Sequence, residues 1–221
     1  HNMKHMSILA VSLLALVACT PEKKQEADYS QYVNPMIGTD FTGNTYPGAQ
    51  VPFGMVQLSP DNGLPGWDRI SGYFYPDTTI AGFSHTHLSG TGAGDLYDIS
   101  FMPVTRPYKE APAPLGIYST FSHNDEAASA GYYRVLLKDY NINVELTATE
   151  RCGIQRYTFP EAEASVFLNL KKAMNWDFTL DSKIEVVDST TIRGYRLSQG
   201  WSPLQHVYFE TRFSKPFVAC H

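Results

Sequence analysis

The sequence predicts an all-β fold, an antiparallel β-sandwich, and three observations support this. Charged residues make up only 18% of the 221 residues, whereas Gly and Pro number 16 and 14 and Tyr and Phe 14 and 12. Such a composition is typical of short strands joined by many turns. Apolar and polar residues also alternate in several short segments. Only residues 124–130 have a helix-like composition, and they could form at most two turns.

The clearest alternation begins at Ile142, which shares one face with Val144, Leu146 and Ala148 while polar residues occupy the positions between them. This period of two is that of a half-buried strand. Shorter alternations occur at residues 166–170, 184–186 and 207–213, with turn-rich stretches between them. Strands at this spacing favour a sandwich.

The N-terminus has the pattern of an export signal. Lys4 is followed by an apolar stretch over residues 8–17 and then by the sequence LVAC, which ends at Cys19. Roughly ten apolar residues are too few to span a bilayer. The LVAC sequence resembles a bacterial lipoprotein signal, which would make Cys19 the lipidated first residue and the only membrane contact. We therefore expect a signal peptide at 1–19, a polar tether at 20–30 and the folded domain at 31–221.

The charge balance argues against a nucleic-acid partner. The chain has 17 basic and 22 acidic side chains and a net charge of −5, without a basic run in the folded region. Proteins bind nucleic acids by neutralising phosphates with clustered Lys and Arg, so a neutral ligand fits better. Cys152 and Cys220 are too few and too far apart for a disulfide framework or a zinc site, and we expect them to serve packing.

Residues 34–98 are dense in Gly, Pro, Asn and aromatic residues and predict long ordered loops. Because such loops are uncommon unless they bind or catalyse, we expect the functional surface here. The apolar run at residues 215–221 predicts a strand that is cut short, since an unpaired edge is usually avoided and more protein should follow.

The most distinctive motif places His85 and His87 two residues apart, so that both side chains would point the same way in an extended chain. Three interpretations compete. The pair could hold zinc or iron together with Asp95 or Asp98. The imidazoles could instead be satisfied by loop backbone at a packed surface. Finally, they could line a sugar pocket or support its wall.

Trp67 lies between turn-forming residues in the loop 61–69, where a buried Trp is less expected. Its face could stack on the apolar side of a pyranose while neighbouring carboxylates such as Asp68 accept sugar hydroxyls. Trp67 could equally be a loop anchor. No pair of acidic residues in this chain stands out as the two opposed carboxylates that glycoside hydrolysis usually needs. The GTGAG sequence at 90–94 is followed by neither a helix pattern nor Gly-Lys-Ser/Thr, which excludes a phosphate loop.

Several motifs, taken in order and with their spacing, resemble glycoside hydrolase family 92. They are NPMIGT at 34–39, PGA at 47–49, PFGM at 52–55, SPD at 59–61, the stretch 82–92, GYY at 131–133, ELTAT at 145–149, Arg151, FP at 159–160, GW at 200–201 and YF at 208–209. The resemblance covers nearly all of the chain beyond the tether.

This resemblance implies an exo-acting, calcium-dependent α-mannosidase, in which an N-terminal β-sandwich packs on a C-terminal (α/α)6 barrel and the active site lies between them. It also implies an inverting mechanism whose general acid, general base and calcium ligands lie mainly on the barrel, so that this chain holds no catalytic residue. By motif position, the substrate-binding residues here would be Trp67, Asp68, His85 and His87.

The leading hypothesis is therefore an exported lipoprotein of the periplasm or outer membrane that removes terminal mannose, with α-1,2 linkage, from glycans; this fragment alone would be inactive. A second hypothesis is a lipid-anchored carbohydrate-binding domain that works without a partner domain. A third is a purely structural sandwich that shields and orients a partner domain.

Overall fold

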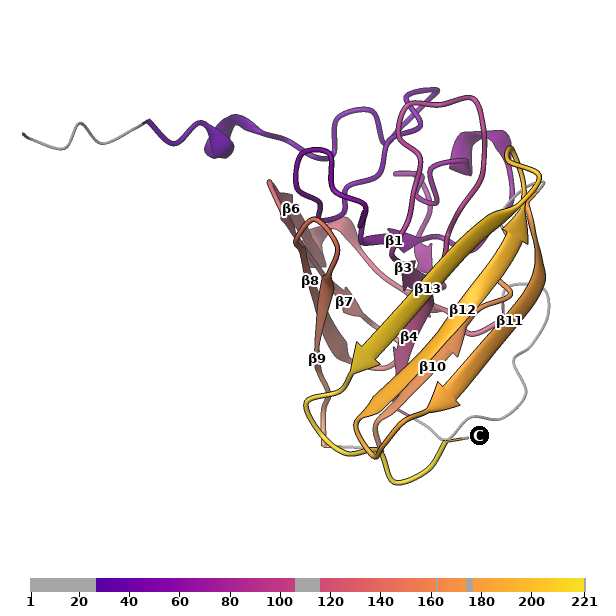
Figure 1. Cartoon of the computed structure of the whole chain (residues 1–221). Helices are drawn as coiled ribbons and strands as arrows, with labels where there is room; N and C mark the ends of the chain where they lie inside the picture. The colour runs from indigo at the N-terminus through magenta and orange to yellow at the C-terminus, as the bar shows by residue number, and fades with distance from the viewer. Residues whose placement is uncertain (1–26, 106–115, 162, 174–176, 221) are drawn as a thin grey trace, which may run out of the picture.

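The computed structural model describes residues 27–105, 116–161, 163–173 and 177–220 (Figure 1). All strand pairs in these residues are antiparallel, which confirms the predicted fold class. The elements are η1 (Ser30–Tyr32), β1 (Ser59–Asp61), η2 (Trp67–Arg69), β2 (Thr79–Ile80), β3 (Gly82–Ser84), β4 (Ser100–Val104), β5 (Ser119–Thr120), η3 (His123–Asp125), β6 (Glu126–Ser129), β7 (Tyr132–Leu137), β8 (Ile142–Ala148), β9 (Gly153–Thr158), β10 (Ser165–Asn169), β11 (Phe178–Val186), β12 (Thr191–Gln199) and β13 (Gln205–Arg212).

The three larger sheets are stacked as layers. The sheet β1-β3-β4-β10 lies between the sheet β6-β7-β8-β9 and the sheet β11-β12-β13, while β2 and β5 form a small separate pair (Figure 1). One apolar core fills the space between β6–β9 and the middle sheet, and a smaller core lies between the middle sheet and β13. Burial of these two cores is the main favourable contribution to folding.

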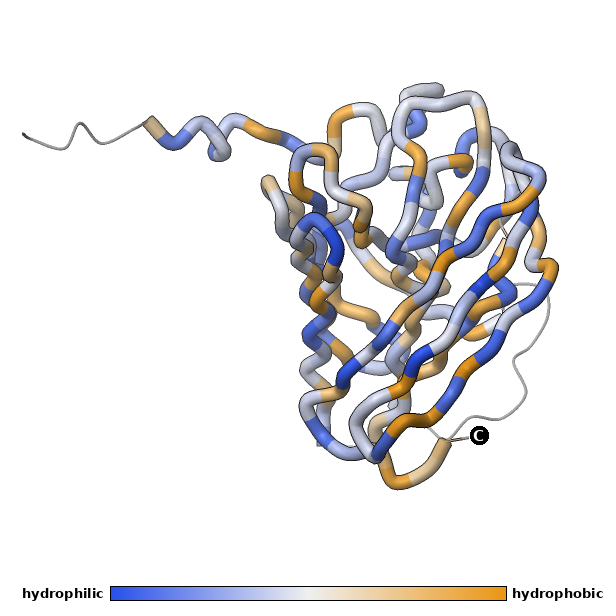
Figure 2. Tube along the Cα trace, viewed as in Figure 1, coloured by the Kyte–Doolittle hydropathy of each residue, from blue (hydrophilic) through white to orange (hydrophobic). Residues whose placement is uncertain are grey.

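Strand β8 confirms the clearest sequence prediction, because Ile142, Val144 and Leu146 are buried and the residues between them are not. Val144 pairs with Val135 of β7 and with Tyr157 of β9, so apolar side chains meet across the sheet. The other predicted alternations fall in β10, β11 and β13. Figure 2 shows the alternation along β11 to β13 as successive blue and orange segments.

Strand β4 did not give a period-two signal, because every one of its residues is buried. Met102 and Val104 face the larger core, whereas Phe101 faces the smaller one. A strand in the middle layer has no solvent face, and its sequence reads as a short apolar run that cannot be told from other buried segments.

Three local predictions were wrong. Residues 124–130 form the end of the single turn η3 and then strand β6, whose Glu126 pairs with Val135 of β7. Sheet pairing overrides helix propensity there. Residues 213–220 form no strand: β13 ends at Arg212, and the chain turns back so that Phe217 N donates to Ser189 O at 2.9 Å. Cys152 and Cys220 are free and exposed, so neither serves core packing.

The predicted leader at 1–19, including Cys19, and most of the tether lie outside the described residues. In the part of the chain that the structure covers, no helix is long and apolar enough to cross a membrane. Residues 34–98 contain only the short elements β1, η2, β2 and β3, and their loops gather at one end of the layers, at the top of Figure 1. This loop end, as predicted, is where ordered but irregular backbone is concentrated.

Candidate functional site

The segment 90–99, here called the Gly90 loop, is the most strained part of the loop end. Leu96, Tyr97 and Ile99 have φ values of 81°, 58° and 56°, in the left-handed region that side chains other than Gly disfavour. Each such backbone conformation destabilises the fold by on the order of 1–3 kcal/mol, and it persists only where contacts with the surrounding structure hold it in place. The Gly90 loop must therefore be held by strong contacts.

One set of contacts centres on Asp98. Its carboxylate accepts from Arg196 Nη1 of β12 at 2.6 Å and from the hydroxyl of Thr86 at 2.7 Å. Arg196 also donates to the carbonyl of Leu96 at 3.1 Å, and only 1% of its side chain is exposed. The buried guanidinium thus joins β12 to the strained loop. Because both charges are buried, losing one partner would leave the other uncompensated.

A second buried set holds the loops to the middle sheet. The carboxylate of Asp61, at the end of β1, accepts from His87 Nε2 at 2.8 Å and from Lys172 Nζ at 2.9 Å. Burial alone would raise the pKa of Asp61, but the positive charges of Lys172 and His87 outweigh it and lower the pKa to about 2. This carboxylate is therefore ionised at neutral pH.

The hydrogen bonds of His87 define its role. Nδ1 lies 2.7 Å from the carbonyl of Gln57, and Nε2 lies 2.8 Å from Asp61 Oδ1 and 2.9 Å from the hydroxyl of Ser84. Both nitrogens are therefore engaged within the protein, and neither is free for a metal ion. His87 is 4% exposed, and it supports the loops of the loop end from the interior of the domain.

His85 is held differently. Its Nδ1 donates to the carbonyl of Ile99 at 2.7 Å, and its Nε2 accepts from the amide of Gln155 at 3.4 Å. Burial lowers the pKa of His85, although the Ile99 hydrogen bond opposes this, so the ring is neutral at pH 7. Of the three interpretations of the His pair, the geometry favours imidazoles that are satisfied internally and support the loops.

The described residues do not fit a metal ion. Within 27–105, 116–161, 163–173 and 177–220, no three His, Cys, Asp or Glu side chains come together as a possible ligand set. The carboxylates considered for this role are already engaged, Asp98 by Arg196 and Asp95 by N–H groups of its own loop and of the β12–β13 connection. The described side chains of these four types therefore offer no cluster that could hold calcium.

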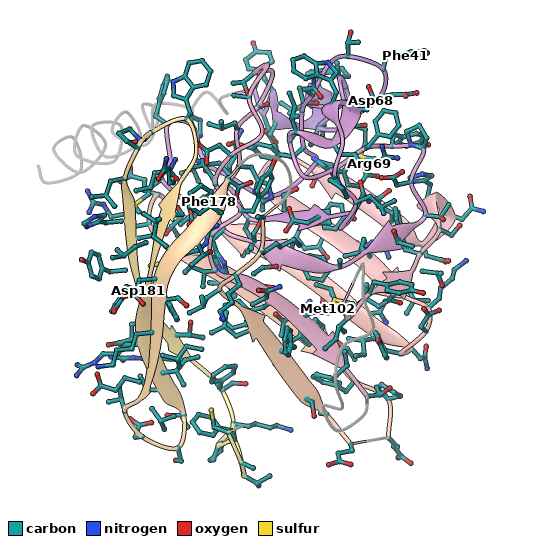
Figure 3. The ribbon with its side chains drawn as sticks, turned by 90° about the vertical axis from the view of Figure 1, so that its right-hand side faces the viewer. Phe41, Asp68, Arg69, Met102, Phe178 and Asp181 are labelled. Atoms are coloured by element: carbon teal, nitrogen blue, oxygen red, sulfur yellow. The ribbon has the colours of Figure 1, made fainter. Side chains whose placement is uncertain are left out.

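Trp67 begins the turn η2 and is 56% exposed. A Cβ on Gly92 would lie 3.3 Å from Cη2 of the Trp67 ring, so the indole edge rests on the Gly90 loop at a residue without a side chain. Asp68 follows and is partly exposed, and Arg69 fixes the turn by its bidentate ion pair with Asp77. Figure 3 shows Asp68 and Arg69 at the loop end, near Phe41. Trp67 and Asp68 thus form an accessible indole and carboxylate on a fixed turn.

Trp201 lies in the connection 200–204 between β12 and β13 and is 78% exposed. Its backbone N–H donates to Asp95 Oδ2 at 2.8 Å, which ties this connection to the Gly90 loop. The sequence did not suggest the contact between Trp201 and Asp95, because more than a hundred positions separate these two residues. The only signal was the Gly-Trp pair among the family motifs.

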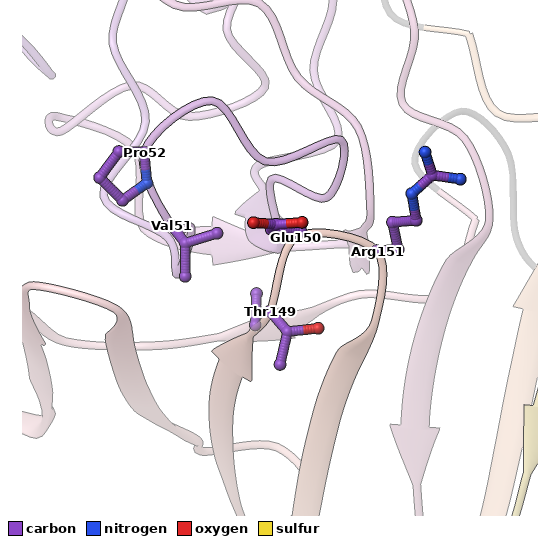
Figure 4. Close-up of a pocket in the computed structure, with 6 residues that line it drawn as sticks. Val51, Pro52, Thr149, Glu150 and Arg151 are labelled. Atoms are coloured by element: carbon purple, nitrogen blue, oxygen red, sulfur yellow. The ribbon is translucent and has the colours of Figure 1, made fainter.

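A shallow hollow open to solvent is lined by Val51, Pro52, Ala148, Thr149, Glu150 and Arg151 (Figure 4). The loop that carries Val51 is fastened to the β8–β9 turn, because Met55 N donates to the carbonyl of Glu150 at 2.7 Å. Glu150 and Arg151 are exposed at its rim. Trp67, His85 and His87 are not among the described residues that line this hollow.

The fold and this loop end define a class of protein: a β-sandwich domain with exposed indole and carboxylate groups, which suit sugar binding, at one end. The family model described as glycosyl hydrolase family 92 N-terminal domain matches residues 32–221. The chain belongs to this family, which confirms the resemblance seen in the motifs.

Solved structures support the assignment. The family GH92 α-mannosidase BT3965 from Bacteroides thetaiotaomicron, solved in complex with mannoimidazole, is 43% identical and superposes with a TM-score of 0.82 over 86% of this chain and 26% of that chain. The GH92 glycosyl hydrolase ccman5 is 28% identical with a TM-score of 0.71, covering 83% of this chain and 26% of that chain. These relatives are glycosidases, and this chain corresponds to their N-terminal domain.

A curated relative, an uncharacterized secreted glycosidase from Arthroderma benhamiae, is 26% identical over 172 residues, which is 73% of this chain and 21% of the relative. The chain therefore spans about a fifth of that protein and about a quarter of the solved mannosidase.

Proposed function

We propose that this chain acts as the N-terminal domain of an exported α-mannosidase that removes terminal mannose, with α-1,2 linkage, from glycans. The observation that carries this proposal is the 43% identity and the TM-score of 0.82 to an α-mannosidase over 86% of the chain. The secreted relative supports export. Lipidation at Cys19 would then place the protein in the periplasm or the outer membrane.

In the proposed enzyme, this domain forms one wall of the sugar pocket. Trp67 offers an exposed indole face, on which the apolar side of a pyranose can stack, and Asp68 offers a carboxylate that can accept sugar hydroxyls. His85 and His87 act from beneath, since their hydrogen bonds set the positions of the strands and loops that carry the wall.

The hydrolysis itself is assigned to the (α/α)6 barrel of the same protein, which would supply the general acid, the general base and the calcium ligands of an inverting mechanism. Two observations support this division. The buried carboxylates of the loop end, Asp61, Asp95 and Asp98, are engaged in ion pairs and hydrogen bonds, and no three described His, Cys, Asp or Glu side chains come together as a metal site. Calcium, when bound on the barrel, would stabilise charge that develops on substrate oxygens.

The test is mannose release from α-1,2-mannobiose by the full-length gene product and by residues 20–221, each with calcium and with a chelator. We expect calcium-dependent release by the full-length product alone. Release by the fragment would overturn the division of labour and place catalysis in the loops at 34–98. If neither protein releases mannose but the fragment binds it, the second hypothesis, a carbohydrate-binding domain, would replace the proposal.

A further inference from the structure

Trp201 is an exposed indole with a fixed place in the fold. It is 78% exposed, and Leu204 in the same connection is 53% exposed. Trp carries more apolar surface than other side chains, and it is enriched at the contact points of binding surfaces. A Trp held in solvent on an ordered connection therefore indicates a contact with something outside the described residues.

Asp95 fixes the position of Trp201. Its Oδ2 accepts from Trp201 N at 2.8 Å and from Gln205 Nε2 at 2.8 Å, and its Oδ1 accepts from Leu96 N at 2.7 Å. The carboxylate lies so close to Gly200 that a side chain there would collide with it. Hydrogen bonds from N–H groups to a carboxylate are stronger than those between neutral groups. The connection is consequently docked on the Gly90 loop.

The two segments that carry the exposed indoles are both fastened to the Gly90 loop. Trp67 rests on Gly92, and Trp201 is tied to Asp95, three residues further along. Three residues of extended chain span at most about 11 Å, so the two attachment points are close. Neither indole N–H donates to another described residue, which leaves both available to a ligand.

We propose that Trp201 and Trp67 form one glycan-binding face, in which Trp201 contacts a sugar ring beyond the terminal mannose. The inference deepens the proposed function and rests on it. An indole face covers the apolar side of a pyranose, and its N–H donates to a hydroxyl. Two such platforms fixed to one loop bind an oligosaccharide along its length, so the ligand is a neutral mannose oligosaccharide rather than a single sugar.

The test compares two substrates of the full-length gene product. α-Mannosyl fluoride has no second sugar, whereas an α-linked mannotriose occupies the whole face. For Trp201→Ala we expect kcat/KM for mannotriose to fall roughly tenfold, as loss of a well-packed contact does, while kcat/KM for the fluoride stays within about twofold of wild type. Trp201→Tyr retains a ring and should recover part of the loss.

Tyr208→Ala is the matched control, because Tyr208 is an aromatic residue of β13 that is 68% exposed, and it should change neither rate. An equal fall on both substrates for Trp201→Ala would overturn the inference, since Trp201 would then act on the fold or on catalysis. Unchanged rates on both would overturn it as well. If the wild-type protein cleaves neither compound, the proposed function itself fails, and this inference fails with it.

Discussion

In the sheet β6–β9, apolar side chains alternate with polar ones and pack into the larger core, as in β8, where Ile142, Val144 and Leu146 are fully buried. In the loop end, by contrast, buried charges hold irregular backbone: Arg196 binds Asp98, and Asp61 binds Lys172 and His87. A regular sheet satisfies its own backbone groups, whereas loops must be fastened by side chains. The sheet therefore depends on packing, whereas the loop end depends on ion pairing.

The variant with the largest expected effect, Arg196→Met, tests the ion pairs. Arg196→Met replaces a buried cation with an apolar side chain and leaves Asp98 without its partner, so the free energy of unfolding should fall by about 3–5 kcal/mol. Guanidinium unfolding of the purified protein measures this. Arg193→Met is the matched control in the same strand, because the Arg193–Glu185 pair is exposed and its loss should matter little. Equal losses in the two variants would contradict the comparison.

The packing of the sheet is tested by Leu146→Ala, which opens a cavity in the larger core. Removal of a buried Leu side chain costs about 2–5 kcal/mol, depending on how far the surroundings relax. We expect a lower unfolding midpoint but unchanged sugar binding by the full-length product. Ile154→Ala in β9, where 57% of the side chain is exposed, should leave the midpoint nearly unchanged. A loss of binding in Leu146→Ala would mean that the sheet and the loop end are coupled.

Acid should weaken the loop end through Asp61. Since its folded-state pKa is lowered to about 2 and its unfolded value is about 3.9, its stabilising contribution is complete above pH 4 and is lost as the pH falls toward 2. Asp61→Asn should lower stability at pH 7 and flatten the dependence between pH 4 and 2. Urea midpoints across this range measure both changes.

Glu145→Gln is the control for that titration. Hydrogen bonds from Arg156 and Tyr132 also lower the pKa of Glu145 to about 2, but this pair lies at the surface of β8. Solvent screens such a pair, so the variant should lose much less stability than Asp61→Asn. A steeper acid dependence in Asp61→Asn than in the wild-type protein would rule out the assigned role of the buried carboxylate.

The smallest expected effect concerns the docking of the β12–β13 connection. Asp95→Ala removes the acceptor of three N–H groups, two of which lie in or beside that connection, and should cost about 1 kcal/mol of global stability. Amide hydrogen exchange at Trp201 should accelerate, while exchange in β8 stays slow. Unchanged exchange at Trp201 would show that Asp95 does not hold the connection.

The regular strands of this protein could largely be predicted from its sequence, but only some features of the irregular loops could be. The alternation at 142–148 predicted β8, and the density of Gly and Pro at 34–98 predicted the loop end. Strand β4 gave no period because it is buried on both faces. Trp67 could be singled out because its neighbours are turn formers, but Trp201 could not, since its link to Asp95 spans 106 positions.

The sequence by itself determined the all-β class, the location of the loop end and, through its motifs, the family. These properties are local, because side-chain period, turn residues and short motifs are read over a few neighbouring positions. Only the tertiary structure decided that the half-buried His85 and the buried His87 are internal supports, and that Asp95 and Asp98 bind β12 or the connection after it. The physical reason is that a polar side chain does not encode its partner, which long-range packing brings to it.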